Sequence, residues 1–329
     1  MIIFVAHDPG AKNHIIPLFE HVRAQGQAAR FIDLAAAQHC EPADAIPNQP
    51  VRLLVTGWSV NQAEWPWVLA ARHHGIKSAT IIDVGIGQTM QNFSAAAGPD
   101  QYIVTNDSTK WELVARGVPT ARVTVTGNPY LEWLLESNKS LMDSDTVRCQ
   151  YGCREHMPLL SVFLPDYGAP RGSLESLHSL LKQSGLASWR LVIRPHPRDP
   201  QRGCPQEARS NLELGDAVWN WENRVSTPAL LAASICSLTF GSTVSAESLA
   251  LGTPSAYFQI GWRYEELERL YANHSAVPRL RCTREFFDFI SGAINNAGTR
   301  TKVLVENYLG ATKHAWAELQ PLMLDGKYL

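Results

Sequence analysis

The chain has 329 residues, of which 45% are hydrophobic, and a formal net charge of −2. This length is enough for two domains, and the small net charge excludes a chain-wide basic surface for nucleic acid. Six cysteines are scattered along the chain, and Cys149 and Cys153 lack the second pair that a zinc site needs. We therefore expect reduced thiols, no bound metal and no nucleic-acid partner.

The first six residues are apolar, but no basic segment accompanies them, so they indicate a buried strand and not a signal peptide. No apolar run reaches the ~18 residues that a membrane-spanning helix needs. We expect a cytoplasmic protein, either free or attached peripherally to the inner face of the membrane.

In the first part of the chain, short apolar segments alternate with segments of helical periodicity. Strands this apolar, separated by helices, are typical of a parallel sheet that is covered on both faces. The expected strands are Ile2–Ala6, Arg30–Leu34, Val51–Thr56, Ser78–Asp83, Gln101–Thr105 and Arg122–Thr126, and the expected helices are His14–Gln25, Glu64–His74 and Asn106–Arg116.

The pattern breaks after residue 126, and residues 137–150 are polar and weakly patterned. A second alternating series follows, with strands expected at Leu159–Leu164, Arg190–Ile193, Ala217–Asn220, Ser234–Thr239 and Ser255–Gln259, and helices at Ser173–Ser184, Pro228–Ala233 and Val244–Leu251. The expected fold class is α/β, with two tandem, doubly wound Rossmann-like domains and an interdomain cleft. The expected divisions are a first domain at 1–136, a junction at 137–154, a second domain at 155–300 and a C-terminal helix within 301–329 that can cross back to the first domain.

The segment from Phe240 to Phe258 reads as a strand end, a small polar turn, a short helix and another strand. The turn Gly241-Ser242-Thr243 has no bulky side chain and opens the helix, so its unpaired N–H groups favour an anion such as phosphate. Glu247 follows one helical turn later and is expected on the surface that faces the same space. Its carboxylate can accept hydrogen bonds from a sugar diol, so the segment predicts a nucleotide or nucleotide-sugar site.

Arg194, His196 and Arg198 follow a short buried strand in the sequence Val192-Ile-Arg-Pro-His-Pro-Arg198. Proline on both sides of His196 stiffens the loop, and three potential cations on a stiff loop suit a phosphate ester or a diphosphate. A solvated basic turn is the alternative. Tyr167, in the loop after the second domain's first strand, is a candidate for stacking or hydrogen bonding, with an ordinary connecting loop as the alternative.

The loop after the first strand of the chain joins it to a helix, which is where open α/β sheets bind ligands. Gly10 allows a tight turn there, and Asn13 is the expected N-cap. His14 then begins the helix and faces the cleft, where a histidine can act as a general base because this side chain titrates near neutral pH. A capping and packing role is the alternative for His14.

Asp83 ends a buried strand on the same rim and is a rival to His14 as the base. The other residues expected to line the acceptor side or the cleft are His7, Asp8, Gly10 and Thr56. Two further patterns carry no site: Gly85-x-Gly87 lacks the helix and third glycine of a dinucleotide fingerprint, and Asp143-x-Asp145 lies in the polar junction and not at a strand end.

The two-domain layout and the Gly241–Pro254 segment resemble the GT-B glycosyltransferase superfamily. Asn13-His-Ile-Ile-Pro17 is similar to the Gly-Gly-His-x-x-Pro start of the lipid-linked N-acetylglucosaminyltransferase of cell-wall synthesis, although the double glycine is absent. Arg194-Pro-His-Pro197 with Ser242-Thr243 resembles the His-Pro and Ser/Thr motifs of bacterial capsule sialyl-type transferases and teichoic-acid polymerases. The resemblance to these transferases and polymerases implies that the motifs hold the phosphate of a cytidine nucleotide. The resemblance to the N-acetylglucosaminyltransferase implies that Glu247 grips the ribose of the nucleotide.

The function expected from these residues is transfer of a sugar from a nucleotide-sugar donor, bound by the second domain, to a hydroxyl acceptor on the first. The acceptor is a glycan, a lipid-linked glycan or a small molecule, the setting is polysaccharide biosynthesis, and no cofactor is needed. One alternative is a nucleotide-sugar 2-epimerase or hydrolase of the same fold. It ranks lower because such epimerases need several acidic residues around the sugar, and the sequence offers Asp83 and Glu64. A non-catalytic nucleotide-sugar-binding subunit is the alternative of another class.

Overall fold

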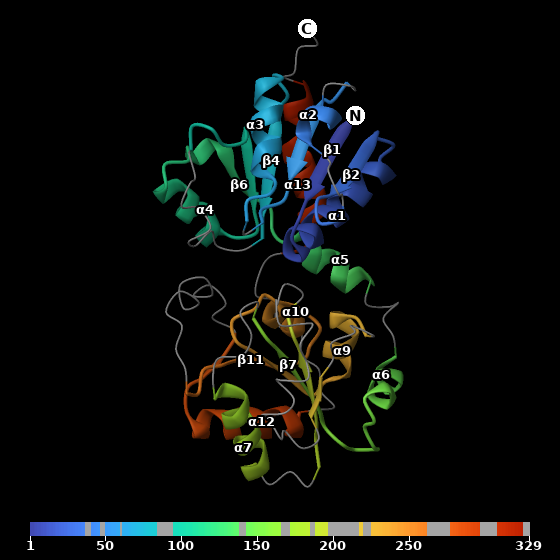
Figure 1. Cartoon of the computed structure of the whole chain (residues 1–329), viewed down its shortest axis with the longest axis vertical. Helices are drawn as coiled ribbons and strands as arrows, with labels where there is room; N and C mark the ends of the chain where they lie inside the picture. The colour runs from blue at the N-terminus through green and yellow to red at the C-terminus, as the bar shows by residue number, and fades with distance from the viewer. Residues whose placement is uncertain are drawn as a thin grey trace. The chain divides into compact units, whose positions relative to one another are not determined.

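A computed structural model describes residues 1–36, 41–46, 50–59, 61–83, 95–137, 143–165, 172–184, 188–196, 217–219, 225–261, 277–296 and 308–324. The chain forms two compact units. Unit 1 consists of Met1–Trp133 and Glu306–Leu329, and unit 2 of Leu134–Val305 (Figure 1).

Unit 1 contains a parallel sheet of six strands in the order β2-β1-β3-β4-β5-β6. The strands are β1 (Ile2–Ala6), β2 (Ala29–Asp33), β3 (Leu53–Thr56), β4 (Ser78–Ile82), β5 (Gln101–Val104) and β6 (Val123–Val125). The helical elements are α1 (Pro9–Ala24), α2 (Pro42–Ala45), α3 (Trp65–His73), α4 (Asp107–Ala115), the 3-10 turn η2 (Thr120–Arg122), the first part of α5 (Pro129–Ser137) and α13 (Ala311–Leu324).

The two faces of this sheet are covered by different helices because side chains alternate along each strand. Ile2 and Phe4 of β1 share a core with α1 and α13, whereas Ile3 and Val5 share one with α2 and α3. Both sets are buried, which explains why β1 is apolar at every position and not at alternate ones.

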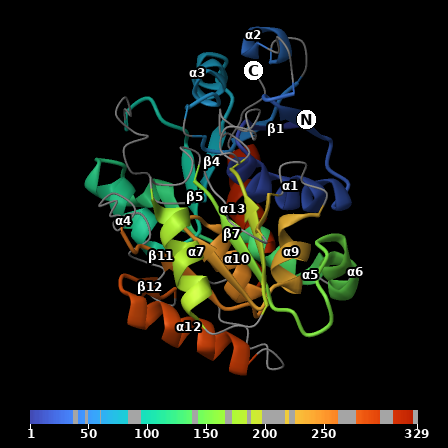
Figure 2. The same cartoon turned by 60° about the horizontal axis from the view of Figure 1, so that its bottom comes forward.

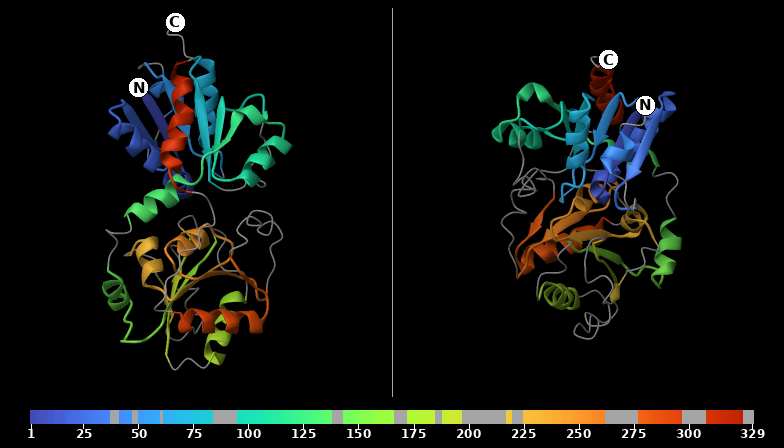
Figure 3. Two further views of the ribbon diagram at one scale, coloured as in Figure 1. Left: turned by 180° about the vertical axis from the view of Figure 1, so that it is seen from behind. Right: turned by 45° about the horizontal axis from the view of Figure 1, so that its top comes forward.

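Helix α13 packs beside α1, although the two are almost the length of the chain apart (Figure 3). Trp316 and Leu319 of α13 lie in the same core cluster as Phe4. The carboxylate of Glu132 accepts hydrogen bonds from the backbone N–H groups of Gly310 at 2.7 Å and Thr312 at 2.9 Å. The C-terminal helix is therefore part of the core of unit 1 and is capped by α5.

Unit 2 repeats the architecture with a parallel sheet in the order β12-β11-β10-β7-β8-β9 (Figure 2). The strands are β7 (Leu159–Phe163), β8 (Arg190–Arg194), β9 (Ala217–Trp219), β10 (Cys236–Thr239), β11 (Ser255–Phe258) and β12 (Arg279–Leu280). The helices are α6 (Ser144–Gln150), α7 (Ser173–Gln183), α9 (Thr227–Ala233), α10 (Val244–Ala250) and α12 (Thr283–Asn295).

Each sheet has one point at which the strand order reverses. In unit 1 it lies between β1 and β3, and in unit 2 between β7 and β10. Open α/β sheets bind ligands at the carboxyl ends of the strands at such a point. The loops that follow these four strands are therefore the places to look for function.

The structure confirms the expected α/β class and most of the expected strands, and it differs in three helices. Helix α1 begins at Pro9, five residues before the expected start. Helix α6 lies inside the expected junction, and its N-cap Asp143 accepts hydrogen bonds from the N–H groups of Asp145 and Thr146 at 3.1 Å. Helix α12 was not predicted. In the part of the chain that the structure describes, every helix is too short or too polar to cross a membrane.

Candidate functional site

The loops after β1 and β3 meet at the reversal point of unit 1. His7 and Asp8 come directly after β1, and Ser59 and Glu64 lie between β3 and α3. Asp8, Ser59 and Glu64 are buried, with 7%, 1% and 3% of their surface exposed, whereas the side chain of His7 keeps 29%. A polar cluster with one accessible member thus lies where the topology predicts a ligand site.

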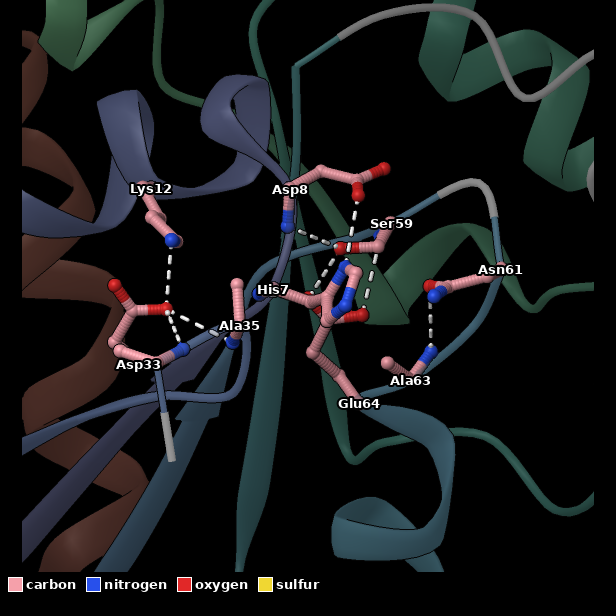
Figure 4. Close-up of polar contacts among 10 residues, drawn as sticks. His7, Asp8, Lys12, Asp33, Ala35, Ser59, Asn61, Ala63 and Glu64 are labelled. Carbon is pink, nitrogen blue, oxygen red and sulfur yellow. Dashed lines mark hydrogen bonds and ion pairs between the residues drawn. The ribbon is translucent and has the colours of Figure 1, made fainter. Parts of the chain in front are cut away.

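Hydrogen bonds join the two loops through the carboxylate of Glu64 (Figure 4). Glu64 Oε1 accepts from the backbone N–H of His7 at 2.8 Å and from Ser59 Oγ at 2.5 Å, and Oε2 accepts from the N–H of Ser59 at 3.1 Å. Ser59 Oγ in turn accepts from the N–H of Asp8 at 3.0 Å. The carboxylate therefore holds two consecutive N–H groups of the β1–α1 loop, one directly and one through a hydroxyl.

His7 and Asp8 also contact each other through their side chains, with Nδ1 of His7 2.9 Å from Oδ1 of Asp8. An ionised carboxylate can only accept, so Nδ1 carries the proton of this contact, and in the neutral ring the lone pair is on Nε2. On the other side of α1, Lys12 Nζ lies 2.6 Å from Oδ1 of Asp33, which ties the helix to the end of β2 (Figure 4).

Asp83 lies at the same edge, directly after β4. A Cβ placed on Gly10 would come within 2.7 Å of Oδ2 of Asp83, so the first turn of α1 and this carboxylate are in close contact. The hydroxyl of Thr105, after β5, donates to the backbone carbonyl of Asp83 at 3.3 Å. Thr56, at the end of β3, is fully buried, and its hydroxyl is hydrogen-bonded to that of Thr80 on β4 at 2.8 Å. It therefore links the ends of two neighbouring strands beneath the site.

The structure places His14 differently from the sequence-based expectation. Because proline suits the first position of a helix, α1 begins at Pro9 with Asp8 as its N-cap, and the prediction of Asn13 as the cap is wrong. His14 consequently lies in the second helical turn and not at the helix start. Its ring is 6% exposed and its centroid is 6.0 Å from that of Tyr130.

In unit 2, the turn between β10 and α10 lies at the reversal point. Gly241 has φ of 100°, a conformation that favours glycine, and Ser242 Oγ accepts a hydrogen bond from the N–H of Val244 at 3.3 Å. Thr243 is the N-cap of α10 and forms no side-chain cap. Glu247 is 6% exposed, so the expectation that it lies on the surface is wrong.

Buried hydroxyl groups fix α10 to the sheet beneath it. Ser237 Oγ lies 2.9 Å from Ser248 Oγ and 2.8 Å from Ser255 Oγ. Ser248 donates to the carbonyl of Thr253, so it must accept from Ser237, and Ser255 must donate to Ser237. The hydroxyl groups of Thr239 and Ser245 are also hydrogen-bonded to each other, at 2.8 Å. The small polar residues of this segment therefore serve packing as well as the turn.

Arg194 and His196 lie at the carboxyl end of β8, and the described part of the chain ends at His196 there. Arg194 ends β8, and its guanidinium donates to the backbone carbonyl of Val225 at 3.1 Å. His196 follows in an irregular segment and is partly exposed. Tyr167 and Arg198 lie outside the described residues. Among the residues that are described, no group of three His, Cys, Asp or Glu side chains could hold a metal ion.

Sequence reasoning named Ser59 only as part of the strand-end loop Thr56-Gly57-Trp58-Ser59, an acceptor contact or a helix cap, and it counted Glu64 only as a second acidic residue. The available signal was an acidic residue five positions after a serine in a loop that leaves a buried strand. Nothing in one sequence shows that its carboxylate turns toward the loop after β1, because that contact spans 57 residues.

The chain has been compared with protein-family models, curated proteins and solved structures. No family model matches it, and no curated protein matches its sequence. The UDP-GlcNAc 2-epimerase of Neisseria meningitidis bound to UDP-GlcNAc is similar in structure, with a TM-score of 0.69, 14% identity and coverage of 97% of this chain and 99% of that one. The UDP-GlcNAc 2-epimerase of Methanocaldococcus jannaschii is also similar, with a TM-score of 0.70, 11% identity and coverage of 97% of this chain and 99% of that one.

A glycosyltransferase of Rickettsia africae is also similar, with a TM-score of 0.63, 13% identity and coverage of 99% of both chains. The chain has the GT-B fold. The resemblance inferred from the sequence is thus confirmed for the fold. It is not confirmed for a glycosyltransferase family, since epimerases and a transferase share this architecture.

Proposed function

We propose that this chain is an enzyme that acts on a nucleotide sugar, and that it is a nucleotide-sugar 2-epimerase. The observation that carries the proposal is that three acidic residues, Asp8, Glu64 and Asp83, lie at one strand edge of unit 1. Asp83 and Glu64 were counted from the sequence as acidic residues for the sugar, and the structure places Asp8, expected there only as a cleft residue, at the same edge. An epimerase ranked below a transferase because the sequence showed few acidic residues for the sugar. Three acidic residues at one edge remove that objection.

The chemistry explains why such an edge suits an epimerase. To invert C2 of a sugar, the C2 proton must leave from one face and a proton must return from the other. The C2–H bond of an acetal is not acidic, so the proton leaves most easily as the bond from C1 to the diphosphate breaks. The C–H electron pair then becomes the C1=C2 bond, and the diphosphate leaves with the electron pair of the C1–O bond. Re-addition of both groups, with the proton on the opposite face, gives the epimer.

This reaction requires groups that move protons and a site that stabilises the departing diphosphate. For the second task we propose Arg194, His196 and the turn Gly241–Thr243, because cationic side chains and backbone N–H groups together suit phosphate oxygens. Glu247 remains our candidate for the ribose. The similar epimerase of Neisseria meningitidis is bound to UDP-GlcNAc, which makes UDP-GlcNAc the first substrate to test.

The test is incubation of the protein with UDP-GlcNAc in D₂O, followed by proton NMR. We expect a second UDP-sugar to form and the C2 position of both sugars to gain deuterium. Binding with full retention of the C2 proton would overturn the epimerase proposal. If none of the UDP-, CMP-, CDP- or GDP-linked sugars raises the melting temperature, the protein is not a nucleotide-sugar enzyme, because a ligand at 100 times its Kd should add about 2.7 kcal/mol.

A glycosyltransferase is the second candidate. Two observations favour it: the sequence Arg194-Pro-His-Pro197, with its resemblance to the His-Pro motif of capsule transferases, and the structural likeness to the glycosyltransferase of Rickettsia africae. A transferase consumes the nucleotide sugar only when an acceptor hydroxyl is added, and it leaves the C2 proton in place. A hydrolase releases free sugar with water alone, and a non-catalytic subunit binds without turnover.

A further inference from the structure

We infer that His7 and Asp8 are the proton-transfer pair of unit 1, with His7 Nε2 as the atom that takes up the proton and Glu64 and Ser59 as the residues that position it. The inference rests on the proposed function and deepens it, since it names which groups move the proton. It also moves the histidine role from His14 to His7.

The first argument comes from helix capping. Asp8 is the N-cap of α1 and Glu64 is the N-cap of α3, yet neither side chain forms a cap hydrogen bond with its own helix. An aspartate at this position ordinarily caps, because its oxygen satisfies an N–H group of the first turn. Both carboxylates are turned elsewhere: that of Asp8 to the ring of His7, and that of Glu64 to the backbone of His7 and to Ser59.

The second argument is the directionality of the hydrogen bonds. Glu64 accepts three of them, one of which comes from Ser59 Oγ, and Ser59 Oγ itself accepts from the N–H of Asp8. These contacts fix the backbone of two consecutive residues, His7 and Asp8. The side chains of those two residues then meet at 2.9 Å, which sets the tautomer of the histidine. A nearly fully buried carboxylate thus positions a histidine that is accessible.

The third argument is the state of the ring itself. Across the described residues of the chain, Nδ1 is the only ring atom of His7 with a hydrogen-bond partner. The side chain is 29% exposed, so part of the ring is accessible from outside the cluster. A base with its lone pair accessible and its other nitrogen held by a carboxylate is the arrangement that general-base catalysis requires. His14, which is buried against Tyr130, lacks this access.

In the proposed reaction, Nε2 takes the C2 proton while the C–H electron pair forms the C1=C2 bond and the diphosphate leaves C1. The ring becomes a cation, and the neighbouring Asp8 carboxylate stabilises that charge. Asp83, at the same edge but directly after β4, is then the group for the opposite face. No oxidant, reductant or further reactant is needed.

The experiment compares His7→Gln and Asp8→Asn with the exposed control His74→Gln, using UDP-GlcNAc turnover. We expect His7→Gln to lower kcat ~10²–10⁴-fold with KM little changed, since a positioned general base contributes about that much. Added imidazole should partly restore turnover in His7→Ala, which a structural role for His7 would not allow. His74→Gln should match the wild type.

A second measurement does not depend on turnover. Nitrogen-15 NMR of the histidine rings should show His7 with its proton on Nδ1 in the wild type, and Asp8→Ala should lose that preference. If the wild type turns over UDP-GlcNAc and His7→Gln keeps its kcat, the inference is wrong and the proposed function stands. If the wild type shows neither binding nor turnover with any nucleotide sugar, the proposed function fails first. A proton on Nε2 in the wild type would also overturn the pair.

Discussion

Ser59 Oγ and Glu64 Oε1 lie 2.5 Å apart in the loop after β3, and these two atoms accept hydrogen bonds from the N–H groups of Asp8 and His7 in the loop after the neighbouring strand β1. Glu64 is the acceptor for three donors, all of them in the β1–α1 or β3–α3 loop. A buried carboxylate is costly unless its hydrogen bonds are complete. The stability of unit 1 should therefore depend on this one side chain.

Glu64→Ala should lower the free energy of unfolding by about 2–4 kcal/mol, because each buried donor left unsatisfied costs about 1–3 kcal/mol. Glu64→Gln should fall between the wild type and Glu64→Ala, since it keeps the volume but replaces one acceptor by an NH₂ group. Urea denaturation measures the effect. The control is Glu155→Gln, whose side chain is 89% exposed and should leave the midpoint unchanged. A midpoint for Glu64→Ala equal to that of the control would show that the network does not stabilise the unit.

Two glycines of unit 1 should respond differently to substitution by alanine. At Gly10, the added Cβ would come 2.7 Å from Oδ2 of Asp83, the end of a side chain that can rotate away. At Gly57, the added Cβ would come 2.6 Å from the Cβ and 3.3 Å from the Cα of Ala11. Ala11 belongs to helix α1, which packs on the sheet and cannot move aside as a side chain can. Neither glycine has positive φ, so crowding alone decides the outcome.

We expect Gly10→Ala to displace the carboxylate of Asp83 and to reduce turnover, with a change in stability below about 1 kcal/mol. Gly57→Ala should destabilise the fold by about 1–3 kcal/mol, as overpacking in a core does. Thermal melts and turnover of the nucleotide sugar, measured on both variants, separate the two effects. Loss of stability in Gly10→Ala that equals that in Gly57→Ala would mean that Asp83 is held rigidly and belongs to the packing.

Most strands could be predicted from the sequence because the central strands of each sheet are buried on both faces, which leaves an apolar run at each of them. The position of α1 could not be predicted in the same way. Asn13 is a good N-cap by residue type, but Pro9 also suits a helix start, and the structure uses the earlier signal. The turn at Gly241 was found because glycine and small polar residues are local signals. The clamp from Glu64 to His7 was not found, because it depends on the pairing of β1 with β3 and not on any local pattern.

His178 offers a test of how burial affects titration in unit 2. It lies on α7, its ring centroid is 6.0 Å from that of Trp189, and it is 9% exposed. Burial, and secondarily the charge of Lys182, lower the pKa of His178 below its ordinary value. The folded protein therefore resists protonation of this ring, whereas the unfolded chain takes up the proton near pH 6.5. Stability should be lost as the pH falls through about 6.5, down to the folded pKa, and level off below it.

His178→Phe should remove this dependence and keep an aromatic ring against Trp189. The measurement is the free energy of unfolding of both proteins at pH 7.5 and at pH 5. We expect the wild type to lose stability relative to His178→Phe on acidification, while the exposed control His74→Gln changes in parallel with the wild type. Parallel curves for the wild type and His178→Phe would show that His178 titrates alike in the folded and unfolded chain.

Asp33 should show the opposite kind of pH dependence at the end of β2. Burial alone would raise its pKa, but the hydrogen bonds from Lys12 and from the N–H groups of Ala35 and Ala36 outweigh burial and hold the pKa below its ordinary value. A carboxyl group with a lowered folded pKa stabilises the protein above its unfolded pKa, near 3.9, and loses that contribution as the pH falls through the folded pKa.

Asp33→Asn should therefore cost about 1 kcal/mol or less at pH 7, since the pair is partly exposed. The difference from the wild type should shrink as the pH is lowered from 5 to 2.5, as followed by urea denaturation. Lys12→Gln removes the cation and keeps the hydrogen bonds from the backbone, so it should lower the free energy of unfolding by less than Asp33→Asn does. A difference between Asp33→Asn and the wild type that stays constant over this pH range would mean that Asp33 acts through packing and not through its charge.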